Sequence, residues 1–256
     1  MRIIDLSVAL KAGIASDPPY MLPQIEYLDH AAGAVQFEQT FPGLKREQLP
    51  DGLGPAVERV TISTHNGTHL DAPWHFHATM DGGKPAWKID EVPLEWFFND
   101  GVKLDFRSKP DGYVCKPDDV ERELDRIGYK LKALDIVLVN TAAGAAYGRP
   151  DFIDKGCGMG REATLHLTRQ GVRVTGTDGW SWDAPFSFTR KRFAETGDAS
   201  IIWEGHKAGR EIGYCHMEKL ANLDKLPPFG FKVCCFPVKV AAASAGWTRC
   251  VAFLEN

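Results

Sequence analysis

Four histidines and one aspartate lie within thirteen residues, from His65 to His77, and these are half of the histidines in the chain. His65, His69 and Asp71 are at even separations, which places their side chains on one side of an extended chain. Imidazole and carboxylate groups together suit zinc, manganese or iron. Histidines in a surface loop or in a hydrogen-bonded core are the alternative, but burying several unpaired polar groups together is costly. The segment therefore predicts a metal site.

The residues around this cluster suggest how it is positioned. Residues 57–64 alternate apolar and polar side chains, which is typical of a half-buried strand. Gly67 can bend the chain after that strand, and Pro73 cannot continue a ladder of backbone hydrogen bonds. His75 follows Asp71 by four residues and could face the same spot without binding the ion.

The run His65-Asn-Gly-Thr-His-Leu-Asp-Ala-Pro-Trp-His75 resembles the signature of the putative cyclase family. This family includes bacterial kynurenine formamidase, isatin hydrolase and related metal-dependent amide and lactone hydrolases. The resemblance implies one domain over residues 1–256. Its fold would be α/β (α+β), the swivelling β/β/α arrangement with a mixed sheet or half-barrel and flanking helices.

A second signature of the family is a helix-borne histidine followed twelve residues later by a glutamate at the start of a strand. His206 and Glu218 reproduce that separation. His216 competes with them, but its context fits a turn residue. His30 lies in a polar region, and His166 lies in the middle of a predicted helix, where a packing role is favoured.

The resemblance implies a site for two divalent ions, zinc or manganese. Carried over residue by residue, His65 and His69 bind one ion, His206 binds the second, and Asp71 and Glu218 contact both. Two cations would lower the pKa of a shared water toward neutrality, and the resulting hydroxide would attack a carbonyl carbon.

His75, which is not a ligand in this assignment, would serve as general acid and base. Its unperturbed pKa near 6.5 suits proton transfer at neutral pH. His77 is the less favoured candidate for the same role.

Two other functions fit part of the pattern. His69, Asp71 and His206 resemble the facial triad of mononuclear iron oxygenases, with Arg210 nearby. Those enzymes usually have all-β jelly-roll folds, and the triad leaves His65 and Glu218 unused. The second alternative is a non-catalytic module in which metal braces a binding surface.

Composition narrows the class of protein. With 256 residues and 44% apolar side chains, the chain can bury a sizeable core. A formal charge of −4 without long basic runs argues against nucleic acid as the main partner. No window resembles a membrane span or a signal peptide, and six cysteines without a Cys-x-x-Cys pair fit reduced thiols. We expect a cytoplasmic enzyme with a small-molecule substrate.

Alternating elements in the middle of the chain predict α/β layers. The strands are expected at residues 2–8, 101–106, 135–140, 172–178, 231–240 and 247–254, and the helices at residues 117–127 and 161–170. Residues 10–56 are rich in Pro, Gly and polar residues and predict a long structureless run, which would be an active-site lid or a subunit contact. The apolar side chains in this run make a homodimer or larger assembly plausible.

Aromatic side chains near the predicted site favour a flat or ring-containing substrate, such as a lactam, lactone or other cyclic amide. The tryptophans concerned are Trp74, Trp180, Trp182 and Trp203. Arg161 and residues 190–192 could hold a substrate carboxylate. The long 10–56 region and the segment 144–187 depart from the compact formamidases, which argues against N-formylkynurenine.

Overall fold

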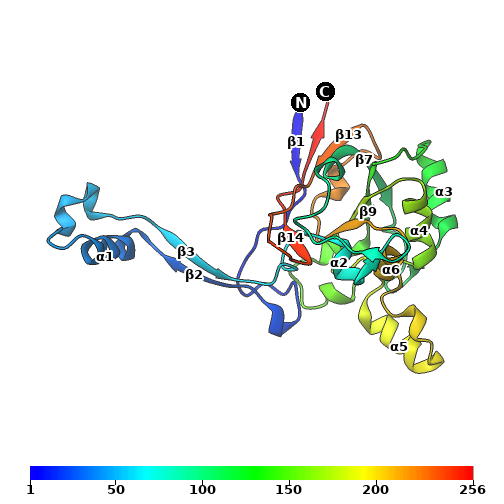
Figure 1. The fold of residues 1–256 in the computed structure, drawn as a ribbon, viewed down its shortest axis with the longest axis horizontal. Coiled ribbons are helices and arrows are strands. Elements are labelled where there is room, and N and C mark those ends of the chain that lie inside the picture. The colour runs from blue at the N-terminus through cyan, green and yellow to red at the C-terminus, as the bar shows by residue number, and fades with distance from the viewer. Residues whose placement is uncertain (256) are drawn as a thin grey trace.

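A curled mixed sheet forms the centre of the protein, which a computed structural model describes over residues 1–255 (Figure 1). β7, β9, β11 and β12 run parallel, and the strands on either side of them pair antiparallel. This half-barrel with flanking helices confirms the predicted fold class. In spatial order the strands of the sheet are β1 (Arg2–Asp5), β15 (Val251–Leu254), β13 (Phe231–Cys234), β7 (Phe98–Asp105), β9 (Ile136–Asn140), β11 (Val174–Thr177), β12 (Cys215–Glu218), β4 (His69–Asp71) and β14 (Ala245–Trp247).

Two predicted helices connect the parallel strands. α3 (Pro117–Ile127) has proline at its first position, and Gly128 ends it at φ 67°, a left-handed conformation that glycine adopts without strain. Val120 is fully buried against the sheet, which contributes about 1.5–3 kcal/mol. The remaining helices are α4 (Arg161–Arg169), also predicted, and α1 (His30–Thr40), α2 (Pro73–Phe76), α5 (Phe186–Thr196) and α6 (Glu204–Lys207).

β9 shows why the predicted strand at its position is apolar throughout. Val137 and Val139 belong to the core that lies under α3 and α4. Ile136 and Leu138 belong to a second core on the opposite face of the sheet. A strand covered on both faces has no position for a polar side chain until its end, at Asn140.

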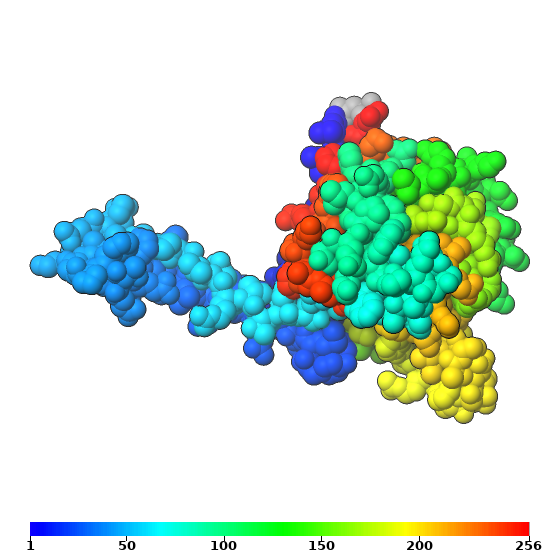
Figure 2. Space-filling view, viewed as in Figure 1, coloured from blue at the N-terminus to red at the C-terminus, as the bar shows by residue number. Residues whose placement is uncertain are grey.

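Residues 24–61, called the arm below, extend far from the sheet (Figures 1 and 2). β2 (Gln24–Leu28) pairs with β3 (Val57–Thr61), and α1 lies at the far end. The expectation of a structureless run was therefore wrong, because a helix and a strand pair form within it. Asp29 stabilises the start of α1 by accepting a hydrogen bond from the backbone N–H of Ala32. The strand expected at 57–64 does form, over Val57–Thr61, but its expected half-burial was wrong: within residues 1–255 β3 pairs with β2 alone, and all five of its residues are exposed.

Several other boundaries differ from those predicted. β13 ends at Cys234 rather than at Val240, and α5 was not predicted.

All six cysteines are free, as expected. Among the described residues no helix has both the length and the apolar character needed to cross a bilayer. Two-stranded ladders are formed by β5 (Thr79–Met80) with β6 (Lys84–Pro85), and by β8 (Val114–Cys115) with β10 (Gly158–Met159).

Candidate metal centre

The first half of the centre comes from β4 and the bend before it. Gly67 adopts φ 61°, and the chain then enters β4, whose three residues are all buried. Alternation along the strand directs His69 and Asp71 to the same side, where His69 Nε2 lies 3.3 Å from Asp71 Oδ1. His65, which precedes the bend, places its Nδ1 2.9 Å from the same carboxylate oxygen. The structure thus brings these three predicted residues together.

β12 supplies the second half. It lies antiparallel beside β4, with His216 opposite Asp71 and Glu218 opposite His69. Glu218 Oε2 is 3.5 Å from His69 Nε2, so the two carboxylates predicted to share ions lie on either side of one imidazole. The sheet register puts His216 level with Thr175 and Val137, so this cluster lies on the face covered by helices.

His216 was predicted to be a turn residue, and that prediction was wrong. It lies within β12, is completely buried, and has its Nε2 3.1 Å from Asp71 Oδ2 and 3.3 Å from Glu218 Oε1. His216 precedes Glu218 by two residues, and side chains two residues apart in a strand lie on the same face of the sheet. This period-two relation was visible in the sequence, and it could have identified His216.

His206 enters from α6 above the sheet. Its Nε2 is 3.8 Å from Asp71 Oδ2 and 3.8 Å from Glu218 Oε1. Asp183 contacts both the start of α6 and the imidazole ring of His206. It accepts hydrogen bonds from the backbone N–H groups of Gly205 and His206, and its Oδ2 is 2.5 Å from His206 Nδ1. Burial alone would lower the pKa of His206, but the hydrogen bond to Asp183 and the nearby carboxylates of Asp71 and Glu218 raise it to about 9. The predicted pairing of distant segments near residues 70 and 210 is present in the structure.

His75 lies on α2 at the edge of this cluster. Its Nε2 is 3.8 Å from Asp71 Oδ2, and its ring packs between His65 and Trp203 at centroid distances of 4.1 and 4.9 Å. Its side chain is 23% exposed, whereas those of His69 and His206 are buried. Burial lowers the pKa of His75 to about 4, which leaves its imidazole neutral and able to accept a proton at pH 7.

The remaining histidines lie outside the cluster. The Nδ1 of His77 is occupied by Thr79, whose backbone N–H and hydroxyl lie 3.0 Å away. His30 bonds to a backbone carbonyl in the arm, and His166 bonds to Gln170 on the surface of α4.

The chemistry of this cluster fits a divalent cation. Burial raises the pKa values of Asp71 and Glu218, but the surrounding imidazoles overcome it and hold both below their usual values, so both groups are ionised. His69 Nε2 and both carboxylate oxygens of Asp71 are buried and lack hydrogen-bond partners. Imidazole nitrogens of His65, His69 and His216 lie 2.9–3.3 Å from the Asp71 oxygens without forming hydrogen bonds to them, and groups in this state are expensive to bury unless an ion binds them. Two sets of donor atoms lie close enough to hold a cation: Asp71, His206, His216 and Glu218, and His65, Asp71 and His75.

A small pocket of about 190 Å³ opens beside the cluster. Its walls include Trp180, Phe186 and Trp203, and Trp203 stacks on His206 at a centroid distance of 4.5 Å. Trp182, also expected near the substrate, is instead buried in the core, where its indole N–H donates to Thr164.

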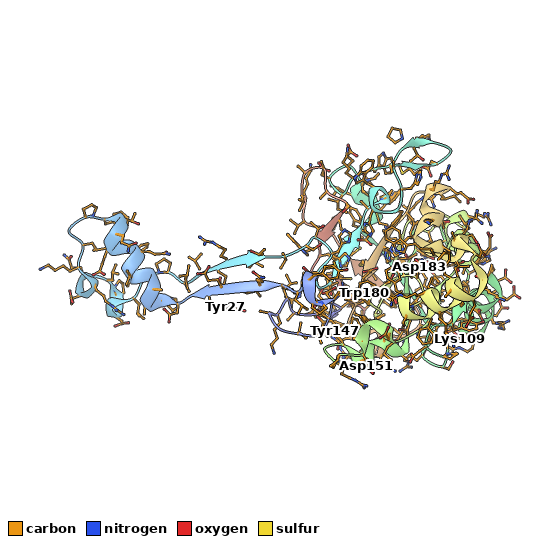
Figure 3. The ribbon with its side chains drawn as sticks, turned by 90° about the horizontal axis from the view of Figure 1, so that it is seen from below. Tyr27, Lys109, Tyr147, Asp151, Trp180 and Asp183 are labelled. Carbon is orange, nitrogen blue, oxygen red and sulfur yellow. The ribbon has the colours of Figure 1, made fainter. Side chains whose placement is uncertain are left out.

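The charged residues that line this pocket are not the predicted arginines. Arg161 forms ion pairs with Glu162 and Glu211 on the surface. Lys219 lines the pocket instead: it is 1% exposed, and its Nζ contacts Asp17 Oδ1 at 2.8 Å and the backbone carbonyl of His65 at 2.9 Å. Lys219 also adopts φ 55°, a strained conformation for a lysine. Asp17 further accepts a hydrogen bond from the indole N–H of Trp180, which Figure 3 shows in the body of the protein, far from Tyr27 on the arm.

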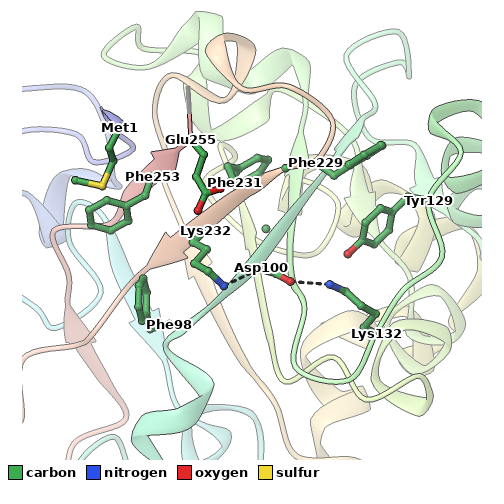
Figure 4. Close-up of a pocket in the computed structure, with 12 residues that line it drawn as sticks. Met1, Phe98, Asp100, Tyr129, Lys132, Phe229, Phe231, Lys232, Phe253 and Glu255 are labelled. Atoms are coloured by element: carbon green, nitrogen blue, oxygen red, sulfur yellow. Dashed lines mark hydrogen bonds and ion pairs between the residues drawn. The ribbon is translucent and has the colours of Figure 1, made fainter.

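A second hollow, of about 530 Å³, lies far from these histidines on the sheet near β7 and β13 (Figure 4). Aromatic side chains such as Phe98, Phe253 and Tyr129 line it. Its central charges neutralise one another, since Asp100 pairs with both Lys132 and Lys232. No histidine lines this hollow.

Comparison with known proteins gives a consistent result. The family model described as "Putative cyclase" matches residues 4–184. An isatin hydrolase bound to the product analogue thioisatinate is similar in structure, with a TM-score of 0.76 and 16% identity over 99% of this chain and 92% of that chain. Isatin hydrolase A from Labrenzia aggregata, bound to benzyl benzoate, gives a TM-score of 0.71 at 21% identity over 100% and 94% of the two chains. A potential metal-dependent hydrolase with cyclase activity gives 0.65 at 17% identity over 100% and 98%.

Proposed function

The chain belongs to the putative cyclase family, and on that basis we propose that it is a metal-dependent hydrolase that opens an amide or lactone bond in a small cyclic or aromatic substrate. The observation that carries this proposal is the buried set of metal-ligating atoms on His69 and Asp71 that have no hydrogen-bond partners, next to a pocket that His75 lines. The named activity of the structurally similar isatin hydrolases supports a cyclic amide as the substrate class.

We assign the residues that would hold two divalent ions, zinc or manganese, as follows. His65 and His69 serve one ion, His206 serves the other, and Asp71 and Glu218 serve both. His216 is added to the second set because its Nε2 faces both carboxylates. Hydrogen bonds to the other ring nitrogen orient His69 and His206, through the carbonyl of Gly67 and the carboxylate of Asp183. When bound, such ions supply Lewis acidity that activates water and polarises a carbonyl.

The chain's own residues carry the proton transfers. A neutral His75 accepts a proton from the attacking water through Nε2, which faces Asp71. The same imidazolium then donates that proton to the leaving nitrogen or oxygen, so that the ring returns to its starting state. Transfer of this kind contributes roughly 10²–10⁴-fold to the rate.

The pocket walls restrict the substrate. Trp180, Phe186 and Trp203 offer aromatic faces, and a volume of about 190 Å³ suits a substrate of one or two rings. The Lys219–Asp17 pair fixes the carbonyl of His65 and so the direction from which that histidine reaches Asp71.

The decisive experiment combines elemental analysis of the purified protein with a hydrolysis screen over lactams, aryl formamides and lactones. We expect about two zinc or manganese ions per chain and turnover of at least one aromatic lactam or lactone. A single ferrous ion with 2-oxoglutarate turnover would instead identify an oxygenase. The oxygenase triad leaves His65, His216 and Glu218 without a role, and the mixed sheet with helices differs from a jelly roll.

We also propose that the enzyme is a homodimer or larger homo-oligomer in which the arm contacts a second copy. An isolated two-stranded hairpin is marginally stable in water. The arm nevertheless exposes large apolar side chains, among them Tyr27 at 67%, Phe41 at 55% and Val60 at 46%. A second copy of the chain that covers these side chains would bury apolar surface that the arm leaves exposed within its own chain, and so would stabilise the arm.

A further inference from the structure

A separate cavity of about 600 Å³ lies where parallel strands of the sheet end. Its lining includes Asn140 at the end of β9, Asp178 just after β11, and Arg107 shortly after β7. In α/β sheets ligands commonly bind beyond the carboxyl ends of parallel strands. We call this space the strand-end cavity.

The strand-end cavity is distinct from the pocket beside the histidines. The two spaces share no lining residue. The chain that leaves β12 separates them, since Lys219 lines the histidine pocket and Leu220 lines the strand-end cavity. The strand-end cavity and the histidine pocket are therefore two separate candidate binding sites.

Asn140 is the first sign that the strand-end cavity is built for a ligand. It is only 3% exposed, and its side-chain Nδ2 is buried without a hydrogen-bond partner. An unsatisfied buried amide destabilises the folded state, and buried polar groups usually have partners. The neighbouring Thr141, by contrast, directs both its backbone N–H and its hydroxyl to Asp178.

Asp178 is the second sign. It is 3% exposed, and Thr141 donates to it from the backbone at 2.9 Å and from the hydroxyl at 2.7 Å. Gly144 approaches so closely that a Cβ there would lie 2.7 Å from Asp178 Oδ2. Among residues 1–255 no lysine, arginine or histidine forms an ion pair with this carboxylate.

The charge of the lining identifies the kind of ligand. Arg107 is already bound through two hydrogen bonds to Asp105, at 2.9 and 2.6 Å. Asp178 and Asp224 then leave the lining acidic, while Val8, Leu220 and Leu223 provide apolar walls. A ligand that complements this lining carries one positive charge on an otherwise apolar molecule.

We propose that the strand-end cavity binds a small organic molecule with a primary ammonium group on an apolar chain or ring. The ammonium donates to the carboxylate of Asp178. Because an ammonium cannot accept from the unpartnered Nδ2 of Asn140, the Asn140 amide turns by 180°, which exchanges its two terminal atoms and places its oxygen where the ammonium can donate to it. The apolar body packs against Leu220 and Leu223. Burial raises the pKa of Asp178 to about 7, so the carboxylate is ready to ionise when a cation arrives. This inference does not depend on the proposed hydrolase activity.

The test is calorimetric titration of the full-length, metal-loaded protein with benzylammonium chloride at pH 8, with benzyl alcohol as the uncharged match. We expect one benzylammonium per chain and at least tenfold weaker binding of the alcohol. Asp178→Asn should weaken benzylammonium binding at least tenfold. Asn140→Leu, which keeps Asp178 and the branching of the side chain but removes its polar atoms, should weaken it several-fold. Asp154→Asn, a carboxylate outside the cavity, should leave the affinity unchanged.

Circular dichroism and thermal unfolding check that each variant is folded, and Asn140→Leu still tests the proposal if Asp178→Asn does not fold. Equal affinity for the amine and the alcohol would overturn the proposal, as would no binding of the amine. Phe186→Leu alters the histidine pocket alone. Loss of binding in that variant, with full binding in Asp178→Asn or Asn140→Leu, would place the amine in the histidine pocket and refute the assignment.

Discussion

Asp183 Oδ2 lies 2.5 Å from His206 Nδ1, and both groups are buried. The same carboxylate accepts the backbone N–H groups of Gly205 and His206, so it fixes both the start of α6 and the ring that α6 carries. A histidine whose Nδ1 is held in this way has its Nε2 directed toward the cluster, where it would bind an ion with loss of the Nε2 proton. We therefore infer that Asp183 is a positioning residue for His206, which we propose as a metal ligand.

Asp183→Asn should lower the affinity for the second metal ion about 10–100-fold, since an amide holds the imidazole less firmly than a carboxylate does. Chelator competition followed by elemental analysis measures this loss directly, without reference to turnover. Asp154→Asn is the matched control and should keep both ions. Unchanged metal affinity in folded Asp183→Asn would show that α6 alone orients His206.

Replacing His75 and His216 separates the two roles that histidines have in this centre. We expect His75→Ala to retain its metal but to lose turnover by roughly 10²–10⁴-fold, because its ring serves the proton transfer. His216→Ala should lose metal, because its Nε2 faces both Asp71 and Glu218. Measuring the metal content and the single-turnover rate of both variants distinguishes a metal ligand from a proton-transfer residue. Equal metal loss in His75→Ala would make that residue a ligand, as its place in the second donor set allows.

The sequence allowed prediction of those parts of the centre that follow from local periodicity or from the family signature. Even spacing placed His69 and Asp71 on one face, and the twelve-residue separation identified His206 and Glu218, which the structure brings beside them. His216 was missed because the strand was expected to start at Glu218, and that expectation was wrong: β12 begins at Cys215 and ends at Glu218, so His216 lies inside the strand. Asp183 could not be identified, since its role depends on a contact across 23 residues that no local pattern encodes.

The pH dependence of stability should report on Asp178. Burial raises the pKa of this carboxyl to about 7 in the folded protein, against an ordinary value of 3.8. Between these values the folded state binds more protons than the unfolded state, so the contribution of Asp178 to stability is full below pH 4 and is lost as the pH rises through 7. The loss amounts to at most about 1.4 kcal/mol per pH unit in that window.

Asp178→Asn removes this titration. We therefore expect the variant to gain stability relative to the natural protein as the pH rises from 5 to 8, as measured by urea unfolding at each pH. The titrations of other groups cancel in the difference between the two proteins. A difference in unfolding free energy that stays constant over this range would mean that Asp178 is ionised throughout in the folded state.

The arm is the region where the sequence was least informative. Its Pro and Gly content suggested irregular chain, yet α1 and the β2–β3 pair form there. Local composition could not reveal this, because pairing of residues 24–28 with 57–61 spans some thirty intervening residues. The exposure of β3 likewise depends on the arm's projection away from the sheet, which alternation of residue types does not determine.

The proposed assembly can be tested on the exposed apolar side chains of the arm. Val57 and Val60 are 45% and 46% exposed, and neither belongs to the cores of the sheet. Val57→Lys combined with Val60→Lys should leave the body folded but weaken self-association, because two buried charges would oppose the contact. Sedimentation at several concentrations measures the shift from a dimer or larger assembly toward the monomer. The matched control is Leu94→Lys, a 66% exposed residue on the body. A natural protein that sediments as a monomer, or a double variant that associates as tightly as the natural protein, would show that the arm serves another purpose.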